Sequence, residues 1–383
     1  MLQTHLTPVN GAIPPDARAV LRIDLTALRA NWAHLNSVSG RAECAGVIKA
    51  DAYGLGLEQI AGALTREGCR TFFVATLDEG RRARSVQPGA TIYVLDGLLP
   101  GAEEYYAGFD LRPLLSSLEE IRDWSAFCRA SKRRLPAAIH IDTGMNRLGM
   151  PPAEVDRLAA APELLQPFDL SLVMSHLACA DEPHNPMNAA QRALFDRLRA
   201  KLPPAPASLA NSGGTFLGPD YHYDLVRPGI ALYGGRAFEG RSNPMQTVVR
   251  LSAKILQVRE VPRGEVVGYG ATYRVEKISR IATVACGYAD GFLRALSGRS
   301  GHPGPAGYIG PHPVPVVGLV SMDLITVDVT DVPEHLVRRG GWVEVMGGRV
   351  TVDDLTDRAG TVGYELLSRL GRRVHRVYEG GGA

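Results

Sequence analysis

Amine chemistry has few candidates in this chain. Only five of its 42 basic residues are lysines: Lys49, Lys132, Lys201, Lys254 and Lys277. Lys49 closes an apolar run in GVIKADAYG, whereas the others stand in polar turns, at a helix end or in an alternating strand. An apolar setting lowers the pKa of a lysine because the ammonium ion is poorly solvated, and the neutral amine can form a Schiff base. We therefore expect Lys49 to bind a carbonyl group, the alternative being a side chain that reaches from a strand end into water.

Two glycine-containing turns farther along the chain offer places for an anion. One begins at Asn211 and Ser212, and the other contains Gly229 and Ile230. Backbone N–H groups in such turns bind phosphate, and the Ser212 hydroxyl adds a donor. Together with a reactive lysine, the two turns indicate pyridoxal 5′-phosphate as the cofactor.

The elements that must position these residues follow a βα pattern from residue 44 to 227. Eight apolar runs alternate with helical segments, which favours a closed (β/α)8 barrel with its active site at the carboxyl ends of the strands. The runs are Cys44–Lys49, Thr71–Ala75, Thr91–Leu95, Leu111–Leu115, Ala137–Ile141, Leu170–Ser175, Ala207–Ala210 and Leu225–Arg227. Helical segments include Leu57–Glu67, Leu77–Arg84, Ser117–Arg129, Ala153–Ala160 and Met187–Lys201.

The pattern changes after about residue 238. Short β-like segments separated by Gly, Pro and Asp predict a C-terminal, mostly antiparallel β domain, with helical periodicity only at Tyr364–Leu370. We expect a barrel domain over 1–238 and a β domain over 239–383, joined within Gly234–Pro244, while the strand at Arg22–Leu25 is free to pair with either. The β segments are Val248–Val258, Val266–Tyr269, Arg280–Cys286, Val314–Val320, Ile325–Val329 and Trp342–Met346.

Composition narrows the class of protein. The 383 residues carry a formal net charge of +2 and are 45% hydrophobic, which is typical of a globular protein and gives no reason to expect a nucleic-acid partner. The first residues lack the pattern of a signal peptide, and no apolar run approaches the ~20 residues that span a bilayer. The five cysteines are scattered without metal-binding spacing. We expect reduced thiols, no metal, no membrane contact and a cytoplasmic location.

The motifs, taken in order, resemble those of the alanine racemases, fold type III pyridoxal-phosphate enzymes. VIKADAYG is similar to the cofactor-lysine motif of that family, which implies that Lys49 binds the aldehyde and Tyr53 the phosphate. DTGMNRLG supplies Arg147, which the resemblance places on the cofactor's phenolic oxygen and the substrate carboxylate. VRPGIALYG implies that Arg227 contacts the pyridine nitrogen, beside phosphate-binding amides, and SHLACAD places His176 between that arginine and a catalytic tyrosine.

The same resemblance extends into the β domain. GYGATY implies that Tyr269 is the second base, and SMD that the Met322 amide holds the substrate carboxylate. GYADG and TVGYE supply Tyr288 and Tyr364 at the entrance, the second also touching the phosphate. Racemisation removes the α proton from one face and returns one on the other, so Lys49 and Tyr269 are expected to bracket the substrate. The family resemblance further implies a homodimer with shared sites that supplies D-alanine for peptidoglycan.

Several positions depart from the family pattern. His140 stands where many members have a lysine that becomes carboxylated and steadies the arginine. A histidine forms no stable carbamate, so we expect a neutral imidazole, an anion or Asn146 to support Arg147. Three further departures concern substrate size and the charge of the entrance: Leu55, Leu319 and Ser321.

Three other functions remain open from the sequence. A broader amino-acid racemase, accepting serine for example, would share every motif. A pyridoxal-phosphate-binding regulatory protein would lack turnover, but such single-barrel relatives also lack the β domain. A fold type III decarboxylase would share the architecture and release carbon dioxide, although the alanine-racemase motifs weigh against it.

Overall fold

The computed structural model describes residues 13–381, which divide into two compact units. The first unit is continuous and spans residues 28–245. The second combines residues 13–27 with residues 246–381. The chain thus enters the second unit with residues 13–27, forms the whole of the first unit, and then returns to the second unit at residue 246.

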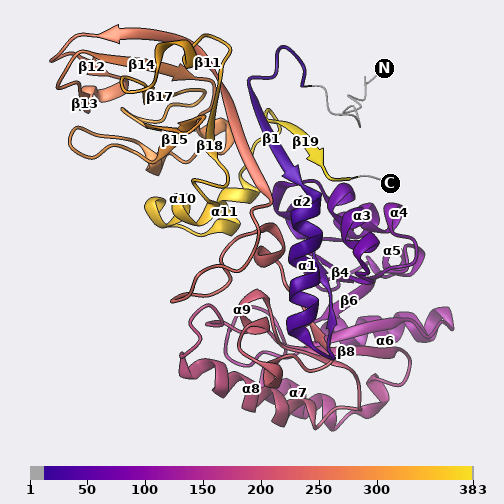
Figure 1. Ribbon diagram of the computed structural model, residues 1–383. Coiled ribbons are helices and arrows are strands. Elements are labelled where there is room, and N and C mark those ends of the chain that lie inside the picture. The colour runs from indigo at the N-terminus through magenta and orange to yellow at the C-terminus, as the bar shows by residue number, and fades with distance from the viewer. Residues whose placement is uncertain (1–12, 382–383) are drawn as a thin grey trace. The chain divides into compact units, whose positions relative to one another are not determined.

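Residues 28–245 form a closed parallel barrel (Figure 1). Strands β3 to β9 pair in sequence order, and β2 pairs with β10. β2 and β3 are consecutive parts of the first barrel strand. The seventh and eighth strands, β9 and β10, are joined by hydrogen bonds from the N–H groups of Asp224 and Arg227 to the carbonyls of Ala207 and Ala210, which closes the barrel. The bounds are β2 (Glu43–Cys44), β3 (Gly46–Val47), β4 (Thr71–Val74), β5 (Thr91–Val94), β6 (Arg112–Leu115), β7 (Pro136–His140), β8 (Asp169–Met174), β9 (Ala207–Ser208) and β10 (Leu225–Val226).

Helices between these strands turn apolar faces toward the barrel. Residues with capping side chains determine where several of these helices begin. Thr76 and Glu79 form a capping box on α4, and Ser117 and Asn185 cap α6 and α8. The core beneath them includes the fully buried Trp124. The helices are α1 (Leu25–Ser39), α2 (Lys49–Gly54), α3 (Leu57–Glu67), α4 (Leu77–Val86), α5 (Glu103–Gly108), α6 (Leu118–Ser131), α7 (Pro152–Ala159), η1 (Pro162–Leu164), α8 (Pro186–Arg199), α9 (Ser212–Thr215), η2 (Pro219–Tyr221) and η3 (Ile230–Tyr233).

The second unit is a mostly antiparallel sheet in the order β16-β15-β18-β11-β1-β19, with β14 and β17 continuing from β11. The N-terminal strand belongs here, because β1 pairs antiparallel with β11 and parallel with β19. The predicted (β/α)8 barrel followed by a mostly antiparallel β domain is therefore confirmed. The strands are β1 (Ala19–Asp24), β11 (Val249–Val261), β12 (Val266–Val267), β13 (Tyr273–Arg274), β14 (Ser279–Val284), β15 (Ala306–Ile309), β16 (His312–Pro315), β17 (Ile325–Asp328), β18 (Trp342–Met346) and β19 (His375–Glu379).

Two local predictions for this unit are wrong. The run Val314–Val320 is not one strand: β16 ends at Pro315, and Gly318 turns away with φ 74°, so close to the Val267 carbonyl that a Cβ would lie 2.8 Å from its oxygen. A helix also precedes the predicted one, as α10 (Val352–Ala359) comes before α11 (Gly363–Ser368). A capping box between Thr351 and Asp354 starts α10. The 3-10 turns are η4 (Tyr269–Ala271), η5 (Tyr288–Asp290), η6 (Arg294–Leu296) and η7 (Glu334–Leu336).

Across residues 13–381, every helix is too short or too polar to cross a membrane. All five cysteines lie in this part of the chain as free thiols.

Candidate active site

Lys49 stands at the carboxyl end of the first barrel strand, two residues after β3 ends. It is partly buried, and burial lowers the pKa of its amine. The Arg147 cation lowers this pKa further, while the Asp96 and Glu79 carboxylates oppose the shift. The environment therefore favours the neutral, nucleophilic form of the amine.

The four residues after Lys49 form one turn of left-handed helix. Ala50, Asp51, Ala52 and Tyr53 have φ between 52 and 57° and ψ between 36 and 53°. Each left-handed residue costs roughly 1–2 kcal/mol unless it is glycine, and none of the four is glycine. Contacts from outside the turn must therefore hold it in this conformation.

Tyr53, at the end of the left-handed turn, packs against the turn that follows the eighth strand. Its side chain is 5% exposed, and a Cβ on Gly229 would lie 2.2 Å from its hydroxyl oxygen, so only glycine fits there. The Tyr53 ring lies 4.6 Å from the ring of Tyr233, whose hydroxyl donates to the Val47 carbonyl at 2.8 Å. The first and eighth strand ends are thus locked together beside Lys49.

Ser212 joins the two predicted phosphate turns. The Asn211 side chain caps α9, and the Ser212 oxygen accepts from the N–H groups of Gly229 at 2.8 Å and Ala231 at 3.4 Å. These two donors occupy both lone pairs of the hydroxyl, which leaves its proton to donate. Ile230 opens η3, and the first N–H groups of a helical turn have no acceptor within it. This corner is a donor-rich place for an anion.

Arg227, which is 4% exposed, is held by four acceptors inside the barrel. Its guanidinium donates to the Ser208 hydroxyl, to the Ser175 carbonyl at 2.7 Å and to the Leu209 carbonyl at 3.4 Å, and contacts Nδ1 of His176 at 3.4 Å. Burial lowers the Arg227 pKa to about 9, so the group is still a cation at neutral pH. Because an arginine only donates, His176 accepts through Nδ1 and carries its proton on Nε2. Burial and the Arg227 cation lower the His176 pKa well below its ordinary value.

Arg147 lies in a loop that leaves β7 and returns beside it. The Asp142 carboxylate organises this loop by accepting from the N–H groups of residues 144, 145 and 146, at 3.0, 3.0 and 3.1 Å. Asn146 has a φ of 54° and donates to the Gly144 carbonyl at 3.2 Å, so its amide nitrogen serves the loop itself. Arg147 is exposed within this chain, yet its charge lowers the pKa of His140 as well as that of Lys49.

His140 is buried at the end of β7. Its Nδ1 lies 3.4 Å from the Ser116 hydroxyl, and burial, together with the Arg227 and Arg147 cations, lowers its pKa to about 4. The imidazole is therefore neutral at neutral pH. Support of Arg147 by this neutral imidazole, by an anion or by Asn146 stays a prediction.

The four site residues predicted for the β domain all lie in the second unit and are exposed there: Tyr269, Tyr288, Met322 and Tyr364. Two backbone hydrogen bonds join the loops that carry Tyr288 and Met322, and we call this pair of bonds the loop clasp. The Tyr288 N–H donates to the Ser321 carbonyl and the Ala289 N–H to the Met322 carbonyl, both at 3.0 Å. Arg373 fixes the clasp by pairing with Asp290 and Asp323.

Tyr269 is the most exposed of the four, at 73%. It opens η4, between two glycines with positive φ, and the hydrophobic cluster of Val261, Val267, Val275, Ile281 and Val317 lies in the same part of the unit. The first unit therefore holds Lys49, Tyr53, Arg147, His176 and Arg227, and the second holds this set of tyrosines with Met322.

Both units match known domains. Residues 23–237 match the N-terminal domain of alanine racemase, and residues 248–378 match the C-terminal domain of alanine racemase. The chain belongs to the alanine racemase family. Alanine racemase from Rhizobium meliloti (strain 1021) is 50% identical over 373 residues, spanning 95% of this chain and 98% of that protein. A catabolic alanine racemase from Mesorhizobium japonicum is 48% identical and spans 95% of this chain and 94% of that protein.

Solved structures agree with the family. The crystal structure of alanine racemase from Bartonella henselae, with covalently bound pyridoxal phosphate, has a TM-score of 0.89 at 39% identity. The match covers 94% of this chain and 99% of that one. The architecture of an alanine racemase is therefore shared over nearly the whole length.

Sequence reasoning missed several residues that shape this alanine racemase site. Tyr233 lay inside a quoted motif, and its place one turn after Gly229 was the available signal. Ser208, which accepts from Arg227, and Arg82, which contacts the left-handed turn, carried no signal because their partners are distant in sequence.

Proposed function

We propose that this protein is a pyridoxal-phosphate-dependent alanine racemase that interconverts L- and D-alanine by a two-base mechanism. The observation that carries the proposal is Lys49, an amine with a lowered pKa at the carboxyl end of a barrel strand, where the charges of Arg147, Asp96 and Glu79 act on it. By contrast, Lys132, Lys201 and Lys277 are exposed. The remaining amine, on Lys254, donates to a backbone carbonyl in the β unit.

The residues present fit pyridoxal phosphate. Lys49 offers the amine for the aldehyde, and the buried Arg227 offers a permanent donor for the pyridine nitrogen. The hydroxyl of Ser212, together with the Ile230 N–H at the start of η3, offers donors for the phosphate, with Tyr53 and Asn211 beside them. The bound cofactor would withdraw electrons from the α carbon of the amino acid.

The chain's own residues divide the remaining tasks. Lys49 Nζ and the Tyr269 hydroxyl would each take the α proton from one face or return it. Arg147 and the Met322 N–H would hold the substrate carboxylate. The His176 Nε2–H, oriented by the contact between Nδ1 and Arg227, would donate to the catalytic phenol. Tyr288 and Tyr364 would line the entrance, with Tyr364 also on the phosphate.

Reduction with borohydride tests the lysine assignment. The yellow holoenzyme should lose its colour on reduction, and peptide mapping should find the pyridoxyl group on Lys49. Lys49→Ala should abolish labelling and racemisation of alanine, whereas Lys132→Ala should leave both intact. A label on another lysine, or a parent protein that binds no cofactor, contradicts the proposal.

We further propose a homodimer in which Tyr269 and Met322 of one chain complete the site around Lys49 of the other. Their exposure within the single chain, 73% and 54%, supports a role against a partner. Co-expressed Lys49→Ala and Tyr269→Ala chains should recover activity, because each heterodimer would contain one intact site. No recovery, despite demonstrated heterodimers, would mean that both bases come from the same chain.

The biological role we propose is the supply of D-alanine for peptidoglycan in the cytoplasm. Deletion of the gene should then make growth depend on added D-alanine, unless a second racemase is present. Comparison of kcat/KM for alanine and serine measures the substrate range, and we expect alanine to be preferred.

A further inference from the structure

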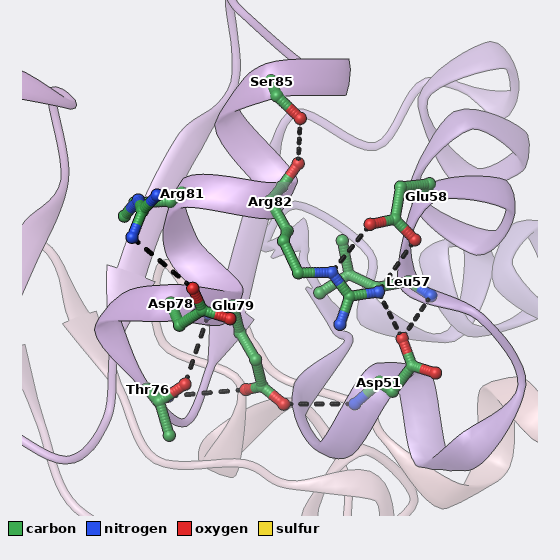
Figure 2. Close-up of polar contacts among 9 residues, drawn as sticks. All are labelled: Asp51, Leu57, Glu58, Thr76, Asp78, Glu79, Arg81, Arg82 and Ser85. Atoms are coloured by element: carbon green, nitrogen blue, oxygen red, sulfur yellow. Dashed lines mark hydrogen bonds and ion pairs between the residues drawn. The ribbon is translucent and has the colours of Figure 1, made fainter. Parts of the chain in front are cut away.

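Asp51 is the point where the left-handed turn after Lys49 is tied to the rest of the barrel (Figure 2). Its N–H donates to the Glu79 carboxylate at 3.1 Å. Its own carboxylate oxygen Oδ1 accepts from the Leu57 N–H at 3.1 Å and from Arg82 Nη2 at 2.5 Å. Both the backbone and the side chain of this one residue are therefore held from outside the turn.

Arg82 is itself fixed before it reaches the turn. Its guanidinium makes a bidentate contact with Glu58, with Nε at 2.7 Å from Oε1 and Nη2 at 2.9 Å from Oε2. The planar fork of arginine suits this geometry, which leaves Nη2 directed at Asp51 as well. The hydrogen bonds from Arg82 lower the pKa of Glu58, which keeps this carboxylate charged.

Glu79 ties the turn to the second strand. One carboxylate oxygen accepts from Asp51, while the other accepts from the N–H groups of Ala75 at 2.9 Å and Thr76 at 3.4 Å, just beyond β4. Together with Arg82 it connects the turn to α3, α4 and the end of β4. We call Asp51, Glu58, Glu79 and Arg82 the brace.

We infer that Arg82 and Glu79 are positioning residues that hold the left-handed turn and so fix Lys49 and Tyr53 for the cofactor. Lys49 directly precedes this turn and Tyr53 ends it. A change in the handedness of the turn would therefore move the Tyr53 hydroxyl away from Gly229. The inference rests on the proposed function, since it assigns a purpose to the same site. Neither Arg82 nor Glu79 touches the predicted reacting atoms, so neither is a catalytic residue.

Arg82→Gln tests this role, with Arg81→Gln as the matched control. Arg81 lies on the same helix and pairs with Asp78 at 3.6 Å, pointing away from Asp51 (Figure 2). The apoprotein of each variant is titrated with pyridoxal 5′-phosphate, following the absorbance of the bound form. Because Arg82 and its partners are partly exposed, the loss is modest: we expect the Arg82 variant to bind about fivefold more weakly, and the control within about twofold of the parent.

A second change separates positioning from general stabilisation. Ala50 is exposed with φ 53°, a conformation that glycine adopts without a steric cost. Adding Ala50→Gly to Arg82→Gln should therefore recover most of the lost cofactor affinity. If Arg82 merely stabilises the fold, Arg82→Gln lowers the thermal midpoint of the apoprotein but leaves the affinity for pyridoxal 5′-phosphate unchanged.

The outcomes distinguish the two proposals. If the parent protein binds no cofactor on Lys49, the proposed function is wrong. If the parent binds and turns over but Arg82→Gln matches Arg81→Gln in affinity, the brace is not a positioning device. Should Arg82→Gln fail to fold, Arg82→Lys keeps the cation without the bidentate fork, and an affinity equal to that of the parent would likewise overturn the inference.

Discussion

Gly229→Ala should destabilise the apoprotein through a single contact. The added Cβ would lie 2.2 Å from the Tyr53 hydroxyl oxygen, 3.0 Å from the ring carbon that bears it and 3.6 Å from the Val47 Cβ. Tyr53 has little room to retreat, because its ring lies 4.6 Å from that of Tyr233. Overpacking of this kind costs about 1–3 kcal/mol. For a unit of this size, about 2 kcal/mol corresponds to a fall of about 4–8 °C in the thermal midpoint.

Removal of the Tyr53 hydroxyl identifies the cause. With Tyr53→Phe, the nearest atom becomes the ring carbon at 3.0 Å, so the double variant should regain a large part of the lost midpoint. Gly89→Ala is the control, because a Cβ there meets nothing within 4 Å and should change stability by less than about 0.5 kcal/mol. Circular dichroism of the four apoproteins provides the measurement. A midpoint for Gly229→Ala equal to that of the parent, or no recovery in the double variant, would refute the reasoning.

The other predictions concern pH, the loop clasp and the support of Arg147. The pKa of His140 is about 4 in the folded protein and 6.5 ordinarily, so as the pH falls the unfolded chain binds this proton first. The free energy of unfolding should therefore be highest above about pH 6.5 and should decrease toward pH 4, by about 3 kcal/mol from this residue. His140→Gln should flatten urea-denaturation stability over that range, although His176 would still contribute; an unchanged slope would exclude His140 as a cause. Arg373→Ala leaves the buried Asp290 carboxylate without its ion pair and should lower the free energy of unfolding by about 2 kcal/mol. The loss is smaller than for a fully buried pair because Arg373 is partly exposed. An unchanged midpoint of chemical denaturation would contradict the role of Arg373 in holding the two loops together. Crystallographic density should show no carboxylated lysine beside Arg147, and finding one would contradict the expectation that a neutral imidazole, an anion or Asn146 supports this arginine.

Much of the barrel could be predicted from the sequence because its strands are buried. The eight apolar runs coincide with barrel strands, since a parallel strand covered on both faces is apolar throughout. The N-terminal strand differs: the strand predicted at Arg22–Leu25 is β1 (Ala19–Asp24), since Leu25 already begins α1. It pairs with β11 and β19, and a pairing over such a distance leaves no local pattern. The prediction of one strand over Val314–Val320 was wrong because Gly318 turns the chain within this apolar run, where its backbone lies close to another segment.

The candidate site shows a similar division. Motif residues such as Lys49 and Arg227 could be identified in order along the chain, but the backbone that directs them could not. The segment after Lys49 contains Ala50, Asp51 and Ala52, whose types favour right-handed conformations. Its left-handed form depends on Arg82 and other partners that are remote in sequence, so only the folded chain reveals it.

The pairing of β1 with β11 and β19 has a consequence for synthesis of the protein. β1 leaves the ribosome before either partner: β11 begins about 220 residues later, which takes roughly 10–45 s at usual rates of elongation, and β19 follows later still. During this interval an apolar strand has exposed edges, while the barrel encoded between β1 and β11 can already fold. Nascent chains arrested before Val249 should therefore recruit holdase chaperones through the β1 segment.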